Sequence, residues 1–110
     1  MDKMATHLGE KLYELRKQRG FTLDKLAELS GLSKSYIWEL ENKESQRPSA
    51  EKLTALADVL GVSTAFFMEE DIRQPEERHL DEAFFRNYQK LEPDSKQQLR
   101  KILDTFKKKP

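Results

Sequence analysis

Apolar residues recur along this chain at intervals of three and four positions, and this spacing constrains the fold more than any other feature. Leu8, Leu12 and Leu15 begin the series, which stops where Gly20 follows Arg19. These intervals place apolar side chains on one face of an α-helix. The alternation typical of strands is absent, and valine and isoleucine are scarce. The sequence therefore predicts an all-α protein.

Capping residues and glycine stops divide residues 6–69 into five short predicted helices. Thr22 and Ser33 are suited to cap the second and third helices, and the second ends at Gly31. Pro48 and Ser49 mark the start of the fourth helix, which ends at Gly61, and Ser63 or Thr64 is suited to cap the fifth. The residues expected to face inward in the second to fifth helices are Leu26, Ala27, Leu29, Ile37, Leu40, Leu53, Leu56, Ala57, Leu60, Phe66 and Phe67.

The chain changes character after this region, which predicts three parts. Residues 1–70 form the first domain, residues 71–79 a charged linker with Pro75, and residues 80–110 a helical association segment. Pro93 suits the first position of the last helix, which gives a C-terminal helical hairpin. The apolar stripes of this hairpin are Leu80, Phe84, Tyr88 and Leu91, then Leu99, Ile102, Leu103 and Phe106.

Composition limits the partners. The 20 basic residues balance the 20 acidic residues, so a chain that binds any polyanion through its overall charge is excluded. Binding to nucleic acid must then come from a local group of cations. The chain has no cysteine, which excludes disulfides and thiolate metal sites. Without a signal-like or membrane-spanning apolar run, a cytoplasmic protein is expected.

The segment "DKLAELSGLSKSYIWELEN" has the form of a helix-turn-helix. Ala27 is small enough for two helices to cross closely, and Gly31 permits a sharp turn with positive φ. Leu32 and Ile37 are expected to anchor the turn and the third helix in the core. A buried Ile37 leaves positions 34, 35, 38, 39 and 42 to face outward.

Residues 8–68 resemble the Cro/repressor-type, or XRE, helix-turn-helix family. The resemblance rests on "LR..RG.T", "LA...G.S...I...E" and "P....L..LA..LGV" at fixed spacing. It implies a five-helix DNA-binding domain whose third helix enters the major groove of double-stranded DNA, usually as part of a two-fold dimer. It also implies an ion pair between Arg16 and Glu41 that fixes the third helix.

The resemblance assigns roles to particular residues. It implies that Lys34, Ser35 and Glu39 read base edges and that Ser33 contacts a phosphate. It also implies backbone contacts from Asn42, Lys43 and Arg47.

Some roles remain open. The alternative to DNA contact for Lys34 and Lys43 is that both are ordinary solvated lysines. Glu39 either accepts from a cytosine amino group or is solvated or paired with a lysine. Trp38 contacts either DNA or neighbouring side chains. Leu23 stands where the family usually has a glutamine that braces the phosphates.

No other chemistry is expected. His7 and His79 are far apart in sequence and are predicted to be solvated, so neither a metal site nor a cofactor is expected. The five acids Glu69, Glu70, Asp71, Glu76 and Glu77 are expected to keep the linker solvated. Because the serines have no plausible histidine base and there is no phosphate-binding glycine loop, the protein is not expected to be an enzyme.

The sequence thus predicts a sequence-specific DNA-binding transcriptional regulator, most simply a dimeric repressor. Residues 80–106 are expected to associate, preferably with a second copy of the chain. The alternative within the class is an antitoxin-like or protease-controlled regulator whose C-terminal helices dock a partner protein. The alternative from another class is a protein-interaction module that does not read DNA. A third possibility for the tail is packing on its own domain.

Overall fold

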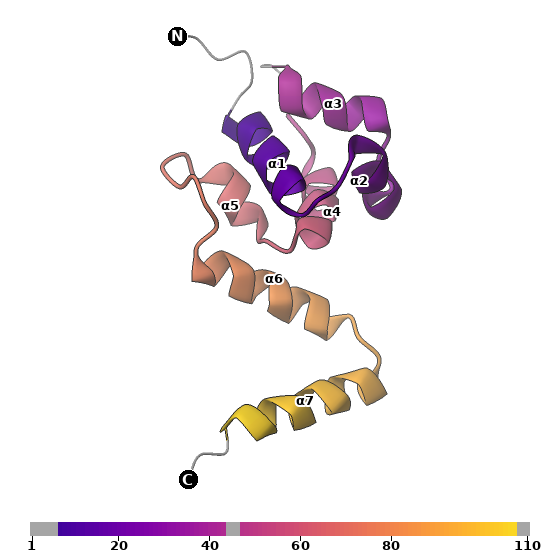
Figure 1. Cartoon of the computed structure of the whole chain (residues 1–110), viewed down its shortest axis with the longest axis vertical. Coiled ribbons are helices and arrows are strands. Elements are labelled where there is room, and N and C mark those ends of the chain that lie inside the picture. The colour runs from indigo at the N-terminus through magenta and orange to yellow at the C-terminus, as the bar shows by residue number, and fades with distance from the viewer. Residues whose placement is uncertain (1–6, 44–46, 108–110) are drawn as a thin grey trace.

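The computed structural model describes residues 7–43 and 47–107, except for the side chain of His7. Within these ranges the chain has seven helices and no strand, which confirms the all-α prediction. They are α1 (His7–Gln18), α2 (Leu23–Ser30), α3 (Lys34–Asn42), α4 (Ala50–Leu60), α5 (Thr64–Met68), α6 (Glu77–Gln89) and α7 (Pro93–Lys107). Helices α1–α5 gather into one bundle, from which α6 and α7 lead away (Figure 1).

Side-chain caps and left-handed glycines set the helix ends as predicted. The hydroxyl of Thr22 accepts from the Lys25 backbone N–H at 3.0 Å. The hydroxyl of Ser33 accepts from the Tyr36 N–H at 3.1 Å. Gly61 ends α4 with φ 76°, a conformation that costs glycine little. These local choices fix where α2, α3 and α4 begin and end.

The core of the bundle is formed by the predicted apolar faces, with one exception. Leu29 is 46% exposed, so its predicted burial is wrong. The covered residues of α2 are Leu23, Leu26, Ala27 and Ser30, and Leu29 lies more than a quarter turn from the middle of this set. The buried apolar residues of the cluster are Leu12, Leu15, Leu26, Ile37, Leu40, Leu53, Leu56, Ala57, Leu60, Val62, Phe66 and Phe67.

Helix α1 crosses the end of α3 at very close range. A Cβ atom on Gly9 would lie 2.6 Å from the Leu40 carbonyl oxygen and 2.8 Å from that of Glu41. A methyl group at position 9 would therefore overlap the backbone of α3, which only glycine avoids. This requirement was not foreseen from the sequence, in which Gly9 stands inside an otherwise ordinary helix.

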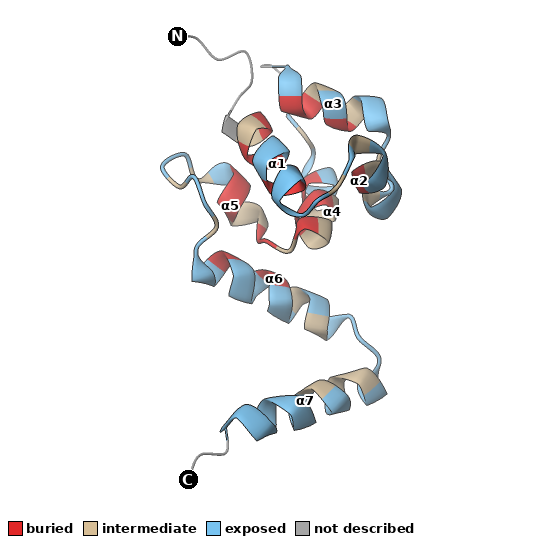
Figure 2. Ribbon diagram, viewed as in Figure 1, coloured by how far each residue is buried: buried red, intermediate tan, exposed pale blue. Residues whose placement is uncertain are grey.

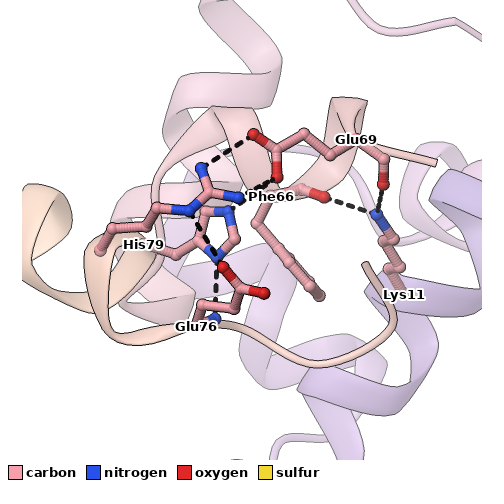
Figure 3. Close-up of polar contacts among 6 residues, drawn as sticks. Lys11, Phe66, Glu69, Glu76 and His79 are labelled. Carbon is pink, nitrogen blue, oxygen red and sulfur yellow. Dashed lines mark hydrogen bonds and ion pairs between the residues drawn. The ribbon is translucent and has the colours of Figure 1, made fainter. Parts of the chain in front are cut away.

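His79 is fully buried, so its predicted solvation is wrong. It lies in the first turn of α6, because that helix begins at Glu77, inside the predicted linker. Its Nδ1 accepts from the Glu76 N–H at 2.8 Å, and its ring packs edge-on against Phe66 (Figure 3). The side chain of His7 is outside the described part of the structure, and its solvation stays a prediction.

Glu69 also departs from the expected solvated linker. Its carboxylate accepts two hydrogen bonds from Arg78, at 3.0 and 2.7 Å (Figure 3). The Arg78 guanidinium, helped by His79, lowers the pKa of Glu69 to about 2. The first turn of α6 is therefore tied to the end of α5 by side chains.

Helices α6 and α7 form an open hairpin rather than a closed one, and the two helices diverge from their connection (Figure 1). Near that connection Lys96 and Arg100 lie over the Tyr88 ring, at 5.6 and 5.8 Å. Helix α6 buries His79 and Ala83 against the bundle, whereas none of α7 is buried (Figure 2). The exposed apolar residues of the two helices and of their connection include Leu80, Phe84, Phe85, Leu91, Ile102, Leu103 and Phe106. Within the described ranges, no helix is long and apolar enough to span a membrane.

Candidate nucleic-acid interface

Helix α3 divides into a buried side and an outward side, and the outward side carries the candidate site. Ile37 and Leu40 are fully buried, and Glu41 is 4% exposed. Ser33, at the N-cap, and Lys34, in the first turn, are exposed. The other predicted contact residues are Ser35, Trp38, Asn42, Lys43 and Arg47, all exposed, and Glu39, which is half-buried.

The outward side is held in place by an ion pair behind it. Arg16 Nε donates to Glu41 Oε2 at 2.7 Å, and a second guanidinium nitrogen donates to Oε1 at 3.0 Å. Arg16 also donates to the Phe21 carbonyl at 3.0 Å, so one side chain links α1, the α1–α2 turn and α3. The hydrogen bond to Glu41 raises the pKa of Arg16 despite burial. The pair implied by the resemblance is thus present, and it fixes α3 on α1.

Both predicted contact lysines already have carboxylate partners on the protein surface. Lys34 Nζ lies 3.4 Å from Asp24 at the start of α2. Lys43 Nζ lies 4.0 Å from Glu39, one turn earlier in α3. Both pairs are solvent-exposed and therefore weak, so a phosphate or base that approaches can displace the carboxylates.

Asn42 and Trp38 are joined to each other through the backbone. The Asn42 side-chain amide donates to the Trp38 carbonyl at 2.9 Å, one turn earlier in α3. Trp38 is 47% exposed, so its ring is half available to an external contact. Arg47 lies beyond the undescribed residues 44–46 and is exposed.

A shallow hollow of about 410 Å³ adjoins the start of α2, beside Lys34. Lys17 and Lys34 line it, together with Thr22 at the N-terminus of α2, where backbone N–H groups favour an anion. Leu23 also borders the hollow and packs partly against the core. Its side chain provides no polar group in place of the glutamine that the resemblance would put there. Asp24 on the rim opposes an anion.

Three features of the site were not found from the sequence: Gly9, Asp24 as the partner of Lys34, and the burial of Lys11. Lys11 is 4% exposed and donates to the Phe66 carbonyl at 2.6 Å. Burial lowers the pKa of Lys11, against the opposing effect of nearby Glu69. A lysine among apolar residues has no sequence signal for burial, because its acceptors are backbone carbonyls 55 and more residues away.

Comparisons with known proteins agree with this geometry. A family model described as Helix-turn-helix matches residues 12–67. The HTH-type transcriptional regulator SinR of Bacillus subtilis (strain 168) is 31% identical over 103 residues, which is 88% of this chain and 89% of that protein. The HTH-type transcriptional regulator SutR of Escherichia coli (strain K12) is 37% identical over 68 residues, 62% of this chain and 38% of that protein.

Solved structures give the same picture. SinR, the master regulator for biofilm formation, in complex with DNA, is 32% identical, with a TM-score of 0.54 over 56% of this chain and 98% of that one. A SinR–SinI protein complex is 30% identical, with a TM-score of 0.57 over 91% of this chain and 94% of that one. The similarity to SinR therefore includes α6 and α7, here together called the arm, as well as the bundle. With the motif, the fold and the relatives in agreement, this chain belongs to the XRE-type helix-turn-helix family of transcriptional regulators.

Proposed function

We propose that this protein is a dimeric, sequence-specific repressor of transcription that reads a two-fold operator through α3 in the major groove. The observation that carries the proposal is the division of α3 into a buried side, held by the Arg16–Glu41 pair, and an outward side of small and polar residues. Its relatives are transcriptional regulators, and one of them was solved with DNA. The proposed role is binding, not catalysis.

The outward residues divide into base readers and backbone contacts. Lys34, Ser35 and Glu39 lie along the first two turns of α3, the part of a recognition helix that reaches base edges. Ser33, Asn42, Lys43 and Arg47 lie at or beyond the ends of α3, where phosphates pass. Trp38 is assigned a contact with sugar or with a thymine methyl group.

The charge of the protein favours selective over indiscriminate binding. The net charge is zero, and Lys34 and Lys43 face carboxylates in the free protein. Few counterions are then released on arbitrary DNA, so affinity for nonspecific duplex is modest.

The arm supplies a dimer or docks a partner protein. Helix α7 exposes a set of large apolar side chains to water: Ile102, Leu103 and Phe106 are between 53% and 70% exposed. Association would remove this apolar surface from water. A helix-turn-helix also needs two copies about 34 Å apart to read a two-fold site. The structure of the SinR–SinI complex matches 91% of this chain, including the arm. Docking of a partner protein on the arm is therefore the second candidate function.

Selection of bound duplexes from a random pool tests the proposal. The expected result is a symmetric consensus that is protected as one site. Lys34→Ala and Ser35→Ala should each weaken binding to the consensus by about 1–3 kcal/mol and relax the preferred base. Arg47→Ala should weaken all duplexes similarly and reduce the salt slope.

Two outcomes would contradict the proposal. If Lys34, Ser35 and Glu39 are all changed to Ala and the preferred sequence is unchanged, the groove assignment is wrong. If the wild-type protein selects no sequence, the alternative of a protein-interaction module replaces DNA reading.

A further inference from the structure

Helix α6 is attached to the bundle at two carboxylates, one near each of its ends. The first attachment, here called the Glu69 clamp, joins the end of α5 to the first turn of α6. Arg78 donates to both Glu69 carboxylate oxygens, at 3.0 and 2.7 Å, and His79 Nε2 lies 3.2 Å from one of them. Two α6 side chains thus hold one carboxylate from the bundle (Figure 3).

The second attachment, here called the Asp58 clamp, holds the last turns of α6 against α4. Arg86 Nε donates to Asp58 Oδ1, and Lys90 Nζ donates to Oδ2 at 2.7 Å. Arg86 also donates to the Val62 carbonyl at 3.0 Å. Burial raises the pKa of Asp58, but the hydrogen bonds from Lys90 and Arg86 outweigh it and keep that pKa below its usual value.

Between the two clamps, α6 is also held by contacts with the bundle. The Ser63 N–H donates to the His79 carbonyl at 3.1 Å, and His79 and Ala83 are the buried residues of α6. Lys11 on α1 donates to the carbonyls of Phe66 and Glu69, which ties the end of α5 to α1. Because α1 packs on α3, the direction of α6 is connected to the orientation of the recognition helix.

Helix α7 is held differently. No residue of α7 is buried, and its described contacts with α6 are those of Lys96 and Arg100 with the Tyr88 ring. The arm therefore consists of a fixed first helix and a second helix that extends its apolar side chains into solvent. The angle at which two copies meet then depends on how α6 leaves the bundle.

We propose that the Glu69 clamp and the Asp58 clamp determine the half-site spacing that the dimer prefers, by fixing the angle between α6 and the DNA-binding bundle. Asp58, Glu69, Arg78 and Arg86 act as positioning residues and do not touch DNA. This inference rests on the proposed function of a dimeric DNA-binding repressor.

The lengths involved make spacing sensitive to this angle. Helix α6 has 13 residues and is about 20 Å long. A rotation of about 10° about its first turn moves its far end by about 3 Å, which is close to the rise of one base pair. Loosening the clamps in both protomers therefore allows the recognition helices to reach sites that differ by a base pair.

The test uses the full chain and duplexes that carry two copies of the selected half-site. The centre-to-centre separation is lengthened or shortened by one or two base pairs, and Kd is measured for each duplex at one salt concentration. Asp58→Asn and Glu69→Gln, singly and together, remove the clamp charges with little change in shape. Asp81→Asn is the matched control, because Asp81 is exposed on the same helix and takes part in neither clamp.

The wild type and the control should prefer one spacing, and the double variant should reduce the ratio of best to neighbouring spacing by about fivefold, the low end of typical coupling between sites. The single variants should fall between. Sedimentation should show an unchanged dimer, and circular dichroism an unchanged helix content. A purely structural role would lower affinity equally at every spacing, and that result would overturn the inference.

Other outcomes are equally decisive. A dimer lost in the double variant would place the clamps in assembly instead of spacing and would overturn the inference. So would a wild type that binds its half-sites but tolerates all spacings. If the wild type selects no DNA sequence, the proposed function fails first, which is a distinguishable result.

Discussion

Helices α4 and α7 carry the same kind of apolar stripe and end with opposite degrees of burial. In α4, Leu53, Leu56 and Leu60 are between 0% and 8% exposed, because α2 and α5 cover them. In α7, Ile102 and Phe106 are 53% and 70% exposed, and no residue among 7–43 and 47–107 buries them. An amphipathic pattern therefore defines a helix and its apolar face but not what packs on that face.

The difference in burial between α4 and α7 is tested most directly by truncating one leucine in each helix. Leu56→Ala in α4 should lower the free energy of unfolding by about 2–5 kcal/mol, because it leaves a cavity in the core. Leu103→Ala in α7 should change the unfolding free energy of the monomer by less than about 0.5 kcal/mol, because that residue is already 55% exposed. Denaturant titration at low protein concentration measures both.

The order of the two effects should reverse when association is measured instead of unfolding. Leu103→Ala should raise the dissociation constant measured by sedimentation, whereas a folded Leu56→Ala dimer should be little changed. Equal effects of the two variants on unfolding at low concentration would mean that α7 is covered within the monomer.

The buried ion pair of the bundle provides the second test. Arg16→Met should destabilise the protein by about 3 kcal/mol, since it leaves the Glu41 carboxylate buried without its cation. Lys25→Met is the matched control, because the Lys25–Glu28 pair is exposed and worth less than about 1 kcal/mol. Thermal melts of both variants would show the difference, and similar losses would mean that solvent screens the Arg16–Glu41 pair.

The crossing of α1 and α3 gives a smaller expected effect. Glycine is a poor helix former, so Gly9→Ala should gain up to about 1 kcal/mol from propensity alone. The contact of the new methyl group with the Leu40 and Glu41 carbonyls should reverse the sign, to a net loss of about 1–3 kcal/mol. Chemical denaturation decides the sign, with Glu14→Ala on the exposed side of α1 as control. A stabilised Gly9→Ala variant would contradict the close crossing.

The smallest expected effect concerns pH and the joint between the two regions. The pKa of Glu69 is lowered from 4.5 to about 2, mainly by Arg78. A carboxyl group whose pKa is lower in the folded state stabilises the fold above its unfolded pKa and loses that contribution as pH falls. Attachment of α6 should thus be constant near neutral pH and weaken between about pH 4.5 and 2.

Melting temperatures measured from neutral pH downward test this expectation. The wild type should lose stability more steeply than Glu69→Gln in acid, because the variant has no carboxylate to protonate at that position. Parallel profiles for the two proteins would show that the Glu69 clamp adds nothing to the attachment of α6.

The sequence was most informative where structure is decided locally. Thr22 and Ser33 were predictable caps because the side chain of each accepts from a backbone N–H three residues later. The outward position of Lys34 and Ser35 followed from a buried Ile37 and helical geometry. The resemblance supplied the partner of Arg16, which no local pattern indicates because Glu41 is 25 residues away.

Errors appeared where burial depends on distant elements. His79 was expected in a solvated linker, but it lies in α6 and is buried there, where Phe66 and Glu69 contact it. Glu69 was expected among free acids, but α6 brings Arg78 to its carboxylate. Leu29 was expected to be buried, but α2 turns another side toward the bundle. The division into residues 1–70, 71–79 and 80–110 remains a prediction.

By itself, the sequence determined the helical periodicity of seven segments and the places where many of them begin and end. It also determined that the third helix has a polar outward side. These features depend on neighbours within about four residues. Only the tertiary structure decided that α1 reaches α3 through Gly9, that Lys11 is buried, and that Asp58 and Glu69 hold α6. These contacts join residues far apart in the chain, so they form only once the bundle has brought the helices together.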